Sequence, residues 1–277
     1  MNNASNSESK SEPEQKSSGA VARRLGAVIL AAGKGTRMNS DLPKVLHPVA
    51  DRPMVDWVVD ACEAIGVSRT AVIVGHQADQ VRKALGNRRQ ISFVEQNPQL
   101  GTGHAVQQAK PVFQHDARDF DVLVLCGDGP LIRKDTLRQL LETHRKTGAA
   151  ATLATSVIPN PQGYGRIVRD AEGKFERIVE HKDATEAQRT IHEVNPSYYC
   201  FKAAPLFELV EKLTNNNAKG EYYLTDVLTL MRNKGLKVEV VDAVPAEDVL
   251  SINTTQELAE VDGILRTRLR KPAGVMG

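Results

Sequence analysis

The sequence predicts an α/β fold in which helices flank a mostly parallel sheet, with a mixed lobe attached. Short apolar runs end at glycines, helix-like segments separate these runs, and shorter strands and turns replace this alternation after about residue 150. Parallel strands that are buried on both faces are continuously apolar, unlike the alternating strands of a half-exposed sheet. The alternation of strand and helix therefore predicts right-handed crossovers and a doubly wound, Rossmann-like sheet.

The first half of the chain supplies the parallel strands. We predict strands at 25–32, 71–74 and 121–126, and helices at 54–65, 77–85 and 102–113. In the first of these helices the apolar residues repeat with the period of about 3.6 residues that is typical of an amphipathic helix. Ligands of such sheets bind beyond the carboxyl ends of the strands, so the loops after Ala32 and Cys126 are the expected site.

The second half predicts a mixed lobe that packs onto the first half and is not an independent domain. The expected strands are 151–157, 166–168, 175–179, 195–201 and 237–241. The expected helices are 203–213, 224–234 and a last helix that begins at Thr254 or Thr255 and runs past Leu265.

The length of 277 residues divides into three parts. Residues 1–24 contain six serines and almost no large apolar side chain, so we expect a disordered leader. It matches neither a secretory signal nor a transit peptide. Residues 25–262 are the expected folded domain, and 263–277 the end of the last helix and a tail.

Composition excludes several classes of protein. The chain has 36 Lys and Arg against 34 Asp and Glu, a net charge of +2, which predicts neither a nucleic-acid nor a membrane partner. No apolar run reaches the roughly 18–20 residues of a membrane span. Cys62, Cys126 and Cys200 match neither a disulfide framework nor a zinc site, so we expect a cytoplasmic location and no catalytic cysteine. Cys62 and Cys126 are expected in the core.

A glycine-rich loop follows the first predicted strand. It reads Gly33-Lys34-Gly35-Thr36-Arg37-Met38, and Pro43-Lys44 comes soon after. Glycines let backbone N–H groups approach a phosphate, and Arg37 and Lys44 could neutralise a triphosphate. The spacing fits neither a Walker loop nor a dinucleotide-binding fingerprint. On glycine content alone, an ordinary turn with solvated cations is an equally good interpretation.

A series of short motifs then follows in one order along the chain. They are Gln96 with LGTGHA at 100–105, Gly127-Asp128, YGRI at 164–167, VEHKDA at 179–184, LTNNN at 213–217 and GEYYLTD at 220–226. LAAGKGTRM followed by LPKVL is similar to the signature of sugar-nucleotide pyrophosphorylases. Over about residues 25–262 the ordered set resembles the uridylyltransferase domain of bacterial bifunctional N-acetylglucosamine-1-phosphate uridylyltransferases. The resemblance implies the nucleotide-diphospho-sugar transferase fold, with a sugar-binding second lobe.

The resemblance also implies site residues. Those expected on the nucleotide side are Leu30, Ala31, Ala32, Gly33, Arg37, Lys44, Gln96, Gly101 and Thr102. Further expected substrate-binding residues are Cys126, Gly127, Asp128 and Asn253. Arg37 and Lys44 would face the phosphates, while an amide and backbone groups would read the uracil edge. Gly165, Glu180 and Asn195 fall on the positions that hold the amino sugar. Without their neighbours, Gln96 would be read as a surface glutamine and Glu180 as one charge in a solvated run. His104 is expected to pack or form hydrogen bonds.

Asp128 and Asn253 are the magnesium ligands that the resemblance implies. Asp128 follows a buried strand, where a carboxylate is costly unless it is paired or binds a cation. Two protein oxygens, with phosphates and waters, are the usual Mg²⁺ arrangement. The alternatives are a turn-forming aspartate before Gly129-Pro130 and an asparagine that precedes the last helix.

The activity implied is Mg²⁺-dependent transfer of UMP from UTP to N-acetyl-α-D-glucosamine 1-phosphate, a cytoplasmic step toward peptidoglycan precursors. Arg37, Lys44 and Asp128 would be its catalytic residues, and these small molecules its partners. Two alternatives stay open: a pyrophosphorylase for another sugar 1-phosphate or nucleotide, and an inactive nucleotide-sugar-binding regulator.

The sequence departs from the family pattern in several places. Gly129 stands where valine is usual, Cys126 where tyrosine can occur, and Pro196-Ser197 where Thr-Gly is usual. The last departure lies beside Asn195 and leaves the sugar preference open, because proline removes a backbone donor. Residues 271–276 resemble the start of the junction to the family's left-handed β-helix, and no hexapeptide repeat follows. We therefore expect no acetyltransferase activity, and a monomer or weak dimer.

Overall fold

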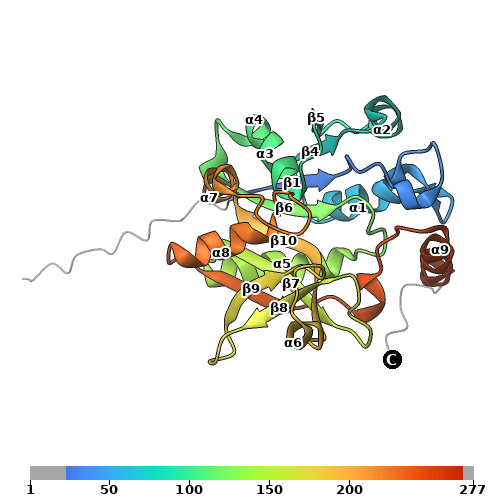
Figure 1. Ribbon diagram of the computed structural model, residues 1–277. Coiled ribbons are helices and arrows are strands. Elements are labelled where there is room, and N and C mark those ends of the chain that lie inside the picture. Colours follow the sequence, from blue (N-terminus) through green and yellow to red (C-terminus); the bar gives the residue numbers. More distant parts are fainter. Residues whose placement is uncertain (1–22, 271–277) are drawn as a thin grey trace, which may run out of the picture.

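Apolar strands form the centre of the fold (Figure 1). The computed structural model describes residues 23–270, so residues 1–22 of the predicted leader and the tail from 271 lie outside the described residues. The predicted leader extends to residue 24, but this boundary is wrong, because Arg24 is already the first residue of β1 and pairs with Phe120 of β6. The central sheet consists of β1 (Arg24–Leu30), β4 (Arg69–Val74), β5 (Ile91–Glu95), β6 (Phe120–Cys126), β7 (Ala151–Val157), β8 (Gly165–Arg169), β9 (Phe175–Val179), β10 (Glu193–Lys202) and β11 (Val238–Asp242). Two short strands, β2 (Pro48–Val49) and β3 (Arg52–Pro53), form a separate hairpin.

The sheet is mostly parallel, as predicted. Its main path runs β11-β7-β10-β6-β1-β4-β5, and β10 is the one strand on this path that runs against its neighbours. β8 and β9 extend from β10 as an antiparallel pair. Three strands of the second half, β7, β10 and β11, therefore belong to the same sheet as β1, while β8 and β9 lead away from it.

Helices cover both faces of the sheet (Figure 1). They are α1 (Met54–Glu63), α2 (Ala78–Leu85), α3 (Thr102–Gln108), α4 (Lys110–Phe113), α5 (Lys134–Thr147), α6 (Glu186–Arg189), α7 (Ala203–Leu209), α8 (Thr225–Asn233) and α9 (Thr255–Arg270). Residues of α1, α2, α5 and α9 pack in one apolar core, and residues of α3, α4, α7 and α8 in the other. Along β1, Ala27 and Ile29 point to the first core and Val28 to the second, all fully buried. This explains why the strand is continuously apolar.

Several elements differ from the sequence prediction. The helix expected over 102–113 is two helices, because Pro111 lacks an N–H and its ring clashes with the carbonyl of the residue four positions earlier. α5 was not predicted, although Leu137, Leu140, Leu141 and His144 are buried at helical spacing. β5 and α6 were also missed. β5 is a half-exposed edge strand without a buried apolar run.

Helix α9 returns to the first half of the chain and packs beside β2. The Asp262 carboxylate accepts a hydrogen bond from Ala50 N at 2.7 Å, and Arg266 pairs with Asp51 at 2.7 Å. α9 continues to Arg270, beyond residue 262, where the sequence analysis places the end of the folded domain. None of the helices within residues 23–270 has both the length and the apolar character required to cross a bilayer.

A buried carboxylate, Asp121 in β6, ties three segments together. Its side chain is 1% exposed, and it pairs with Arg23 at 2.6 Å and with Arg145 of α5 at 3.1 Å. Burial alone would raise the pKa of Asp121, but hydrogen bonds from His144, Arg23 and Arg145 outweigh it and lower the pKa to about 2. The ionised carboxylate therefore stabilises the folded chain.

Replacing Asp121 with asparagine is expected to lower the free energy of unfolding at pH 7 by about 2 kcal/mol, the value that the pKa depression implies. A depressed carboxyl pKa gives stability that is complete above the unfolded-state pKa and is lost as pH falls through the folded-state value. The wild type should therefore lose this contribution between about pH 4 and pH 2. Urea unfolding across that range measures it. Asp119→Asn, at an exposed neighbouring position, is the control, and equal pH dependence in all three proteins would contradict the expectation.

Candidate active site

The loops after β1 and β6 begin side by side at the carboxyl edge of the sheet. The two strands are parallel and in register, with Leu30 opposite Cys126, and Gly127 N donates to Leu30 O at 2.9 Å. A Cβ at Gly127 would lie 3.1 Å from that carbonyl, so glycine permits the close approach. Because β10 runs in the opposite direction, its first residues reach the same edge.

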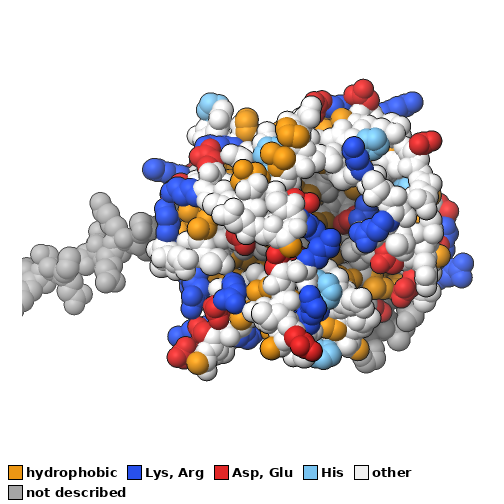
Figure 2. Space-filling model, viewed as in Figure 1, with side chains coloured by type: hydrophobic (Ala, Val, Ile, Leu, Met, Phe, Trp, Pro, Cys, Tyr) orange, Lys and Arg blue, Asp and Glu red, His pale blue; other side chains and the backbone are white. Residues whose placement is uncertain are grey.

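Two adjoining cavities open at this edge. The smaller, of about 300 Å³, lies over β1, and the larger, of about 650 Å³, lies between the loop after β6 and the strands β8 to β10. Cys126 and Asp128 line both. Figure 2 shows the hollow on this face, with Lys and Arg in blue and carboxylates in red around it.

The structure brings together nearly all of the predicted site residues. The smaller cavity is lined by Leu30, Ala31, Ala32, Gly33, Lys44, Gln96, Gly101 and Thr102. The larger is lined by Arg37, Gly165, Glu180, Asn195 and Asn253. Gly127 is buried behind the loop and lines neither of these two cavities.

Lys44, Asp128 and Asn253 form the centre where the cavities meet. Lys44 Nζ lies 2.5 Å from Asp128 Oδ2 and 2.8 Å from Asn253 Oδ1, and Arg37 donates to the same Asn253 oxygen at 2.9 Å. Lys44 begins a 3-10 helix whose next two residues, Val45 and Leu46, are buried and anchor it.

Gly35 is the position in the first loop where glycine is required. It has φ of +62°, and a Cβ there would lie 2.7 Å from Lys44 Cβ. The glycine thus lets the loop fold against Lys44.

The donor set fits a hard divalent cation. Asp128 Oδ2 and Asn253 Oδ1 both contact one ammonium group, so the two oxygens are close enough to share a single cation. Carboxylate and amide oxygens are suitable ligands for Mg²⁺, which keeps several waters or phosphate oxygens. Within residues 23–270, no group of three or more His, Cys, Asp and Glu side chains could hold a metal alone.

The start of α9 positions Asn253. Thr254 Oγ1 accepts from Glu257 N at 3.2 Å, and the Glu257 carboxylate accepts from the backbone N of Thr254 at 2.8 Å and of Asn253 at 2.7 Å. This is a capping box. Asn253 therefore precedes the last helix, which was the alternative interpretation of this residue from the sequence. Its side-chain oxygen nevertheless contacts Lys44.

Gln96 and His104 are paired within the protein. Gln96 is 5% exposed, so it is not the surface glutamine that its sequence alone would suggest. Its Nε2 donates to Gly101 O at 2.8 Å and lies 3.2 Å from His104 Nδ1. The prediction that His104 forms hydrogen bonds is confirmed.

The loop around Thr102 is hydrogen-bonded to the segment 222–224, which lies far away in the sequence. Gly103 N donates to Tyr222 O at 2.7 Å, Tyr222 N donates to Leu100 O at 2.8 Å, and Thr102 Oγ1 accepts from Leu224 N at 3.0 Å. A Cβ at Gly101 would lie 2.7 Å from Tyr222 O. The segment after residue 220 is thereby clamped to the loop that precedes α3, a coupling that the sequence analysis missed.

Glu180, the residue directly after β9, and Asn195 of β10 line the larger cavity. Asn195 is buried; its Nδ2 donates to Tyr199 OH at 2.7 Å and its Oδ1 accepts from Ser197 N at 3.1 Å. Burial raises the pKa of Glu180, and the Lys219 cation opposes this rise. Gly165 lies between them, and a Cβ there would be 3.5 Å from Glu180 Oε1.

Pro196 and Ser197 lie in an irregularity of β10. The pairing with β7 shifts between Val194 and Tyr198, so Pro196 removes no hydrogen bond from that ladder. Ser197 has φ of +67°, a left-handed conformation that costs a residue other than glycine about 1–2 kcal/mol. It lines the larger cavity beside Asn195.

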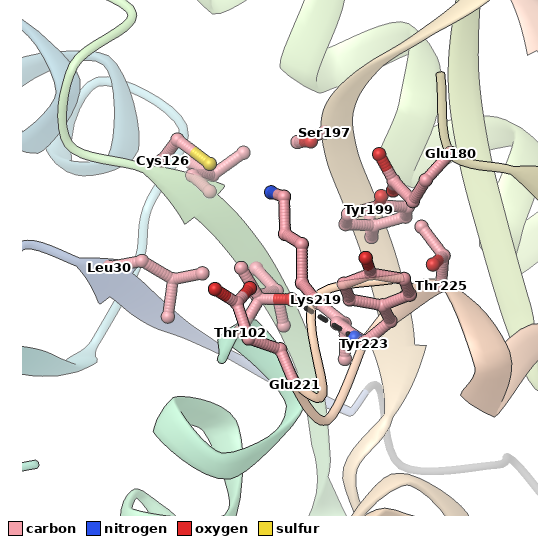
Figure 3. Close-up of a pocket in the computed structure, with 13 residues that line it drawn as sticks. Leu30, Thr102, Cys126, Glu180, Ser197, Tyr199, Lys219, Glu221, Tyr223 and Thr225 are labelled. Atoms are coloured by element: carbon pink, nitrogen blue, oxygen red, sulfur yellow. Dashed lines mark hydrogen bonds between the residues drawn. The ribbon is translucent and has the colours of Figure 1, made fainter. Parts of the chain in front are cut away.

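The expectation that Cys126 lies in the core is wrong. Cys62 is fully buried, but Cys126 is half-buried and lines both cavities because it is the last residue of β6, where the strand meets the site. A third cavity, of about 170 Å³, is also lined by Cys126, and we call it the inner cavity (Figure 3). Lys219, Glu221 and Tyr223 line this cavity.

Comparison with known proteins identifies the family of the chain. The MobA-like NTP transferase domain matches residues 27–221, more than half of the chain. The bifunctional protein GlmU of Geobacter metallireducens is 47% identical over 247 residues, which is 89% of this chain and 52% of the relative. GlmU proteins of Geobacillus sp. (strain WCH70) and Alkaliphilus oremlandii are 48% and 46% identical over 88% and 90% of this chain. The chain spans about half the length of these relatives. It belongs to the MobA-like NTP transferase family.

Proposed function

We propose that the chain transfers UMP from UTP to N-acetyl-α-D-glucosamine 1-phosphate and releases pyrophosphate. The observation that carries the proposal is the cluster of Lys44, Asp128, Asn253 and Arg37 at the junction of two cavities. Transfer between two phosphorylated substrates needs positive charge where the substrates meet. The ordered motifs that resemble N-acetylglucosamine-1-phosphate uridylyltransferases support this choice of substrates, and a cytoplasmic role in supplying peptidoglycan precursors.

The two cavities suit the two substrates. In the smaller, the backbone of residues 30–33, together with Gln96, Gly101 and Thr102, would hold the nucleotide. In the larger, Glu180 and Asn195 would accept and donate hydrogen bonds to sugar hydroxyl and acetamido groups. Asp128 borders both cavities.

The reaction itself requires positioning and charge neutralisation. The sugar phosphate oxygen attacks the α-phosphorus of UTP and pyrophosphate leaves. A phosphate monoester is already an adequate nucleophile near neutral pH, so the chain needs no general base. Lys44 and Arg37 would stabilise negative charge on the α-phosphate and on the leaving pyrophosphate.

We infer that Asp128 and Asn253 hold Mg²⁺. The metal, when bound, would supply positive charge to phosphate oxygens of both substrates. Asp128 also has a second role, because its carboxylate orients the Lys44 ammonium at 2.5 Å.

Pyrophosphate release from a panel of nucleoside triphosphates and sugar 1-phosphates, with and without Mg²⁺, tests the proposal. We expect UTP with N-acetylglucosamine 1-phosphate to give the highest kcat/KM, and chelation by EDTA to abolish it. Faster release with another pair would establish the alternative substrate class. Binding of both substrates without release would establish the regulator instead.

The affinity for the sugar 1-phosphate should depend on the protonation of Glu180. Its pKa is raised, so as pH falls its carboxylate is protonated at a higher pH than an ordinary glutamate would be, and one hydrogen-bond acceptor for sugar hydroxyls is lost. We expect KM for the sugar 1-phosphate to rise on the acid side in the wild type. In Glu180→Gln, KM for the sugar 1-phosphate should be several-fold higher at every pH. It should lack the rise on the acid side that protonation of Glu180 causes in the wild type.

The measurement is KM against pH at saturating UTP. The substrate phosphate itself titrates near a pKa of about 6, and comparing wild type with variant removes this shared effect. Identical pH profiles, whatever the absolute KM, would contradict the role of Glu180.

A further inference from the structure

Lys219 reaches the site from the second half of the chain, whereas Arg37 and Lys44 come from the loop after β1. It lines both the larger cavity, which Arg37 also lines, and the inner cavity. Figure 3 shows its side chain extending into the middle of the inner cavity, among Cys126, Ser197 and Tyr199. The residue is exposed, as lysines usually are, and its side chain lines a cavity where a ligand could reach the ammonium.

A turn that is held by side-chain hydrogen bonds presents Lys219 to the cavity. Asn217 Oδ1 accepts from the backbone N of Lys219 at 3.2 Å and of Glu221 at 3.2 Å, and Asn217 Nδ2 donates to Glu221 O at 2.6 Å. Ala218 N donates to Asp183 Oδ1 at 2.8 Å. The turn is therefore tied both to itself and to the loop after β9.

The same turn is connected to the nucleotide side. Residue 222 follows it directly and is clamped to Leu100 and Gly103 by the two backbone hydrogen bonds described above. The position of Lys219 thus depends on the loop that would hold the nucleotide.

The electrostatic setting of Lys219 points to an anionic ligand. Glu180, Asp183, Glu221 and Asp226 lie on this side of the site, and the pKa of Glu180 is influenced by the other three carboxylates and by Lys219. Among residues 23–270, Lys219 has no carboxylate within ion-pair distance, whereas Lys44 is already paired with Asp128. A substrate dianion in the larger cavity would face this acidic side, and Lys219 is a cation that can offset the repulsion.

We propose that Lys219 binds the phosphate of the sugar 1-phosphate in the cavity that it shares with Arg37. This inference rests on the proposed function, because it names one contact for the second substrate. The ammonium would donate a charge-assisted hydrogen bond to a phosphate oxygen and orient the phosphate toward the junction of the cavities. The pyranose ring and its acetamido group would remain with Glu180 and Asn195.

The test compares Lys219→Gln, Lys219→Arg and the control Lys174→Gln, which removes an exposed lysine from the turn between β8 and β9. Steady-state kinetics give KM for each substrate, and titration calorimetry gives Kd for N-acetylglucosamine 1-phosphate and for unphosphorylated N-acetylglucosamine. In Lys219→Gln we expect KM and Kd for the sugar 1-phosphate to rise about tenfold, the effect of one charge-assisted hydrogen bond. KM for UTP and Kd for the unphosphorylated sugar should change less than about twofold. Lys219→Arg should keep most of the affinity, and Lys174→Gln all of it.

An unchanged KM and Kd in Lys219→Gln, with an active wild type, would overturn the Lys219 inference and leave the proposed function standing. An equal loss for UTP, or for the unphosphorylated sugar, would also overturn it, since the residue would then support the fold of the site. A wild type that binds the sugar 1-phosphate but releases no pyrophosphate would refute the proposed function, while the calorimetric comparison would still decide on Lys219. A wild type that binds no sugar 1-phosphate would refute both.

Discussion

Replacing Asp128 with asparagine is expected to lower the rate of pyrophosphate release by about 10³-fold while the chain stays folded. The change keeps the shape of the side chain and removes its charge. That charge holds the Lys44 ammonium at 2.5 Å and, in the proposed reaction, binds the metal. Losing a preorganised electrostatic contact of this kind costs about 10²–10³ in rate, and metal binding would be weakened in addition.

Pyrophosphate release at saturating substrates and a Mg²⁺ titration of the rate measure this effect. We expect both a lower kcat and a higher Mg²⁺ requirement. Asp135→Asn is the matched control, because Asp135 is a surface carboxylate that is 75% exposed and pairs with Arg138 in the same helix. Circular dichroism establishes that each variant is folded. Wild-type turnover in folded Asp128→Asn would refute the assignment.

The sequence could predict that the loop from Gly33 to Lys44 and the loop with Asp128 lie at the same edge of the sheet. This follows from the apolar runs that precede the two loops. Two continuous apolar strands end at Leu30 and Cys126, and parallel strands place their carboxyl ends together. The resemblance supplied the partners from the second half, Glu180, Asn195 and Asn253. Their meeting in one cavity depends on β10, whose reversed direction brings its first residues to this edge.

Long-range contacts could not be predicted in this way. The bond from Leu224 N to Thr102 Oγ1 joins residues 122 positions apart, and nothing in either local sequence indicates it. The direction of Lys219 likewise depends on a turn whose partner, Asp183, lies in another loop. Ser197 adopts a left-handed conformation that its residue type disfavours, and only the surrounding sheet imposes it.

The missed helix α5 has a different cause, because its signal was present. Leu137, Leu140, Leu141 and His144 repeat at helical spacing, and all four are buried. The helix 102–113 illustrates the opposite error, since an apolar period alone does not reveal that Pro111 must interrupt the hydrogen-bond ladder. Periodicity identifies the face of a helix, while proline and glycine decide where it ends.

Replacing Lys44 with methionine is expected to lower kcat by about 100-fold, through loss of one cation that stabilises developing negative charge. Methionine keeps an unbranched apolar stem beside Gly35, so the first loop should retain its shape. The exposed Lys83→Met in α2 is the control, and its kcat should be unchanged.

The Mg²⁺ requirement separates the role of Lys44 from that of Asp128. In the structure, the Lys44 ammonium contacts both oxygens that we assign to the metal, at 2.5 and 2.8 Å. Two cations that share the same oxygens repel each other and compete for them. Removing the ammonium should therefore leave the Mg²⁺ concentration for half-maximal rate unchanged or lower it, whereas Asp128→Asn should raise it. A Lys44→Met enzyme that needs more Mg²⁺ than the wild type would show that Lys44 helps to hold the two oxygens in place, and the direct role in charge stabilisation would then have to be abandoned.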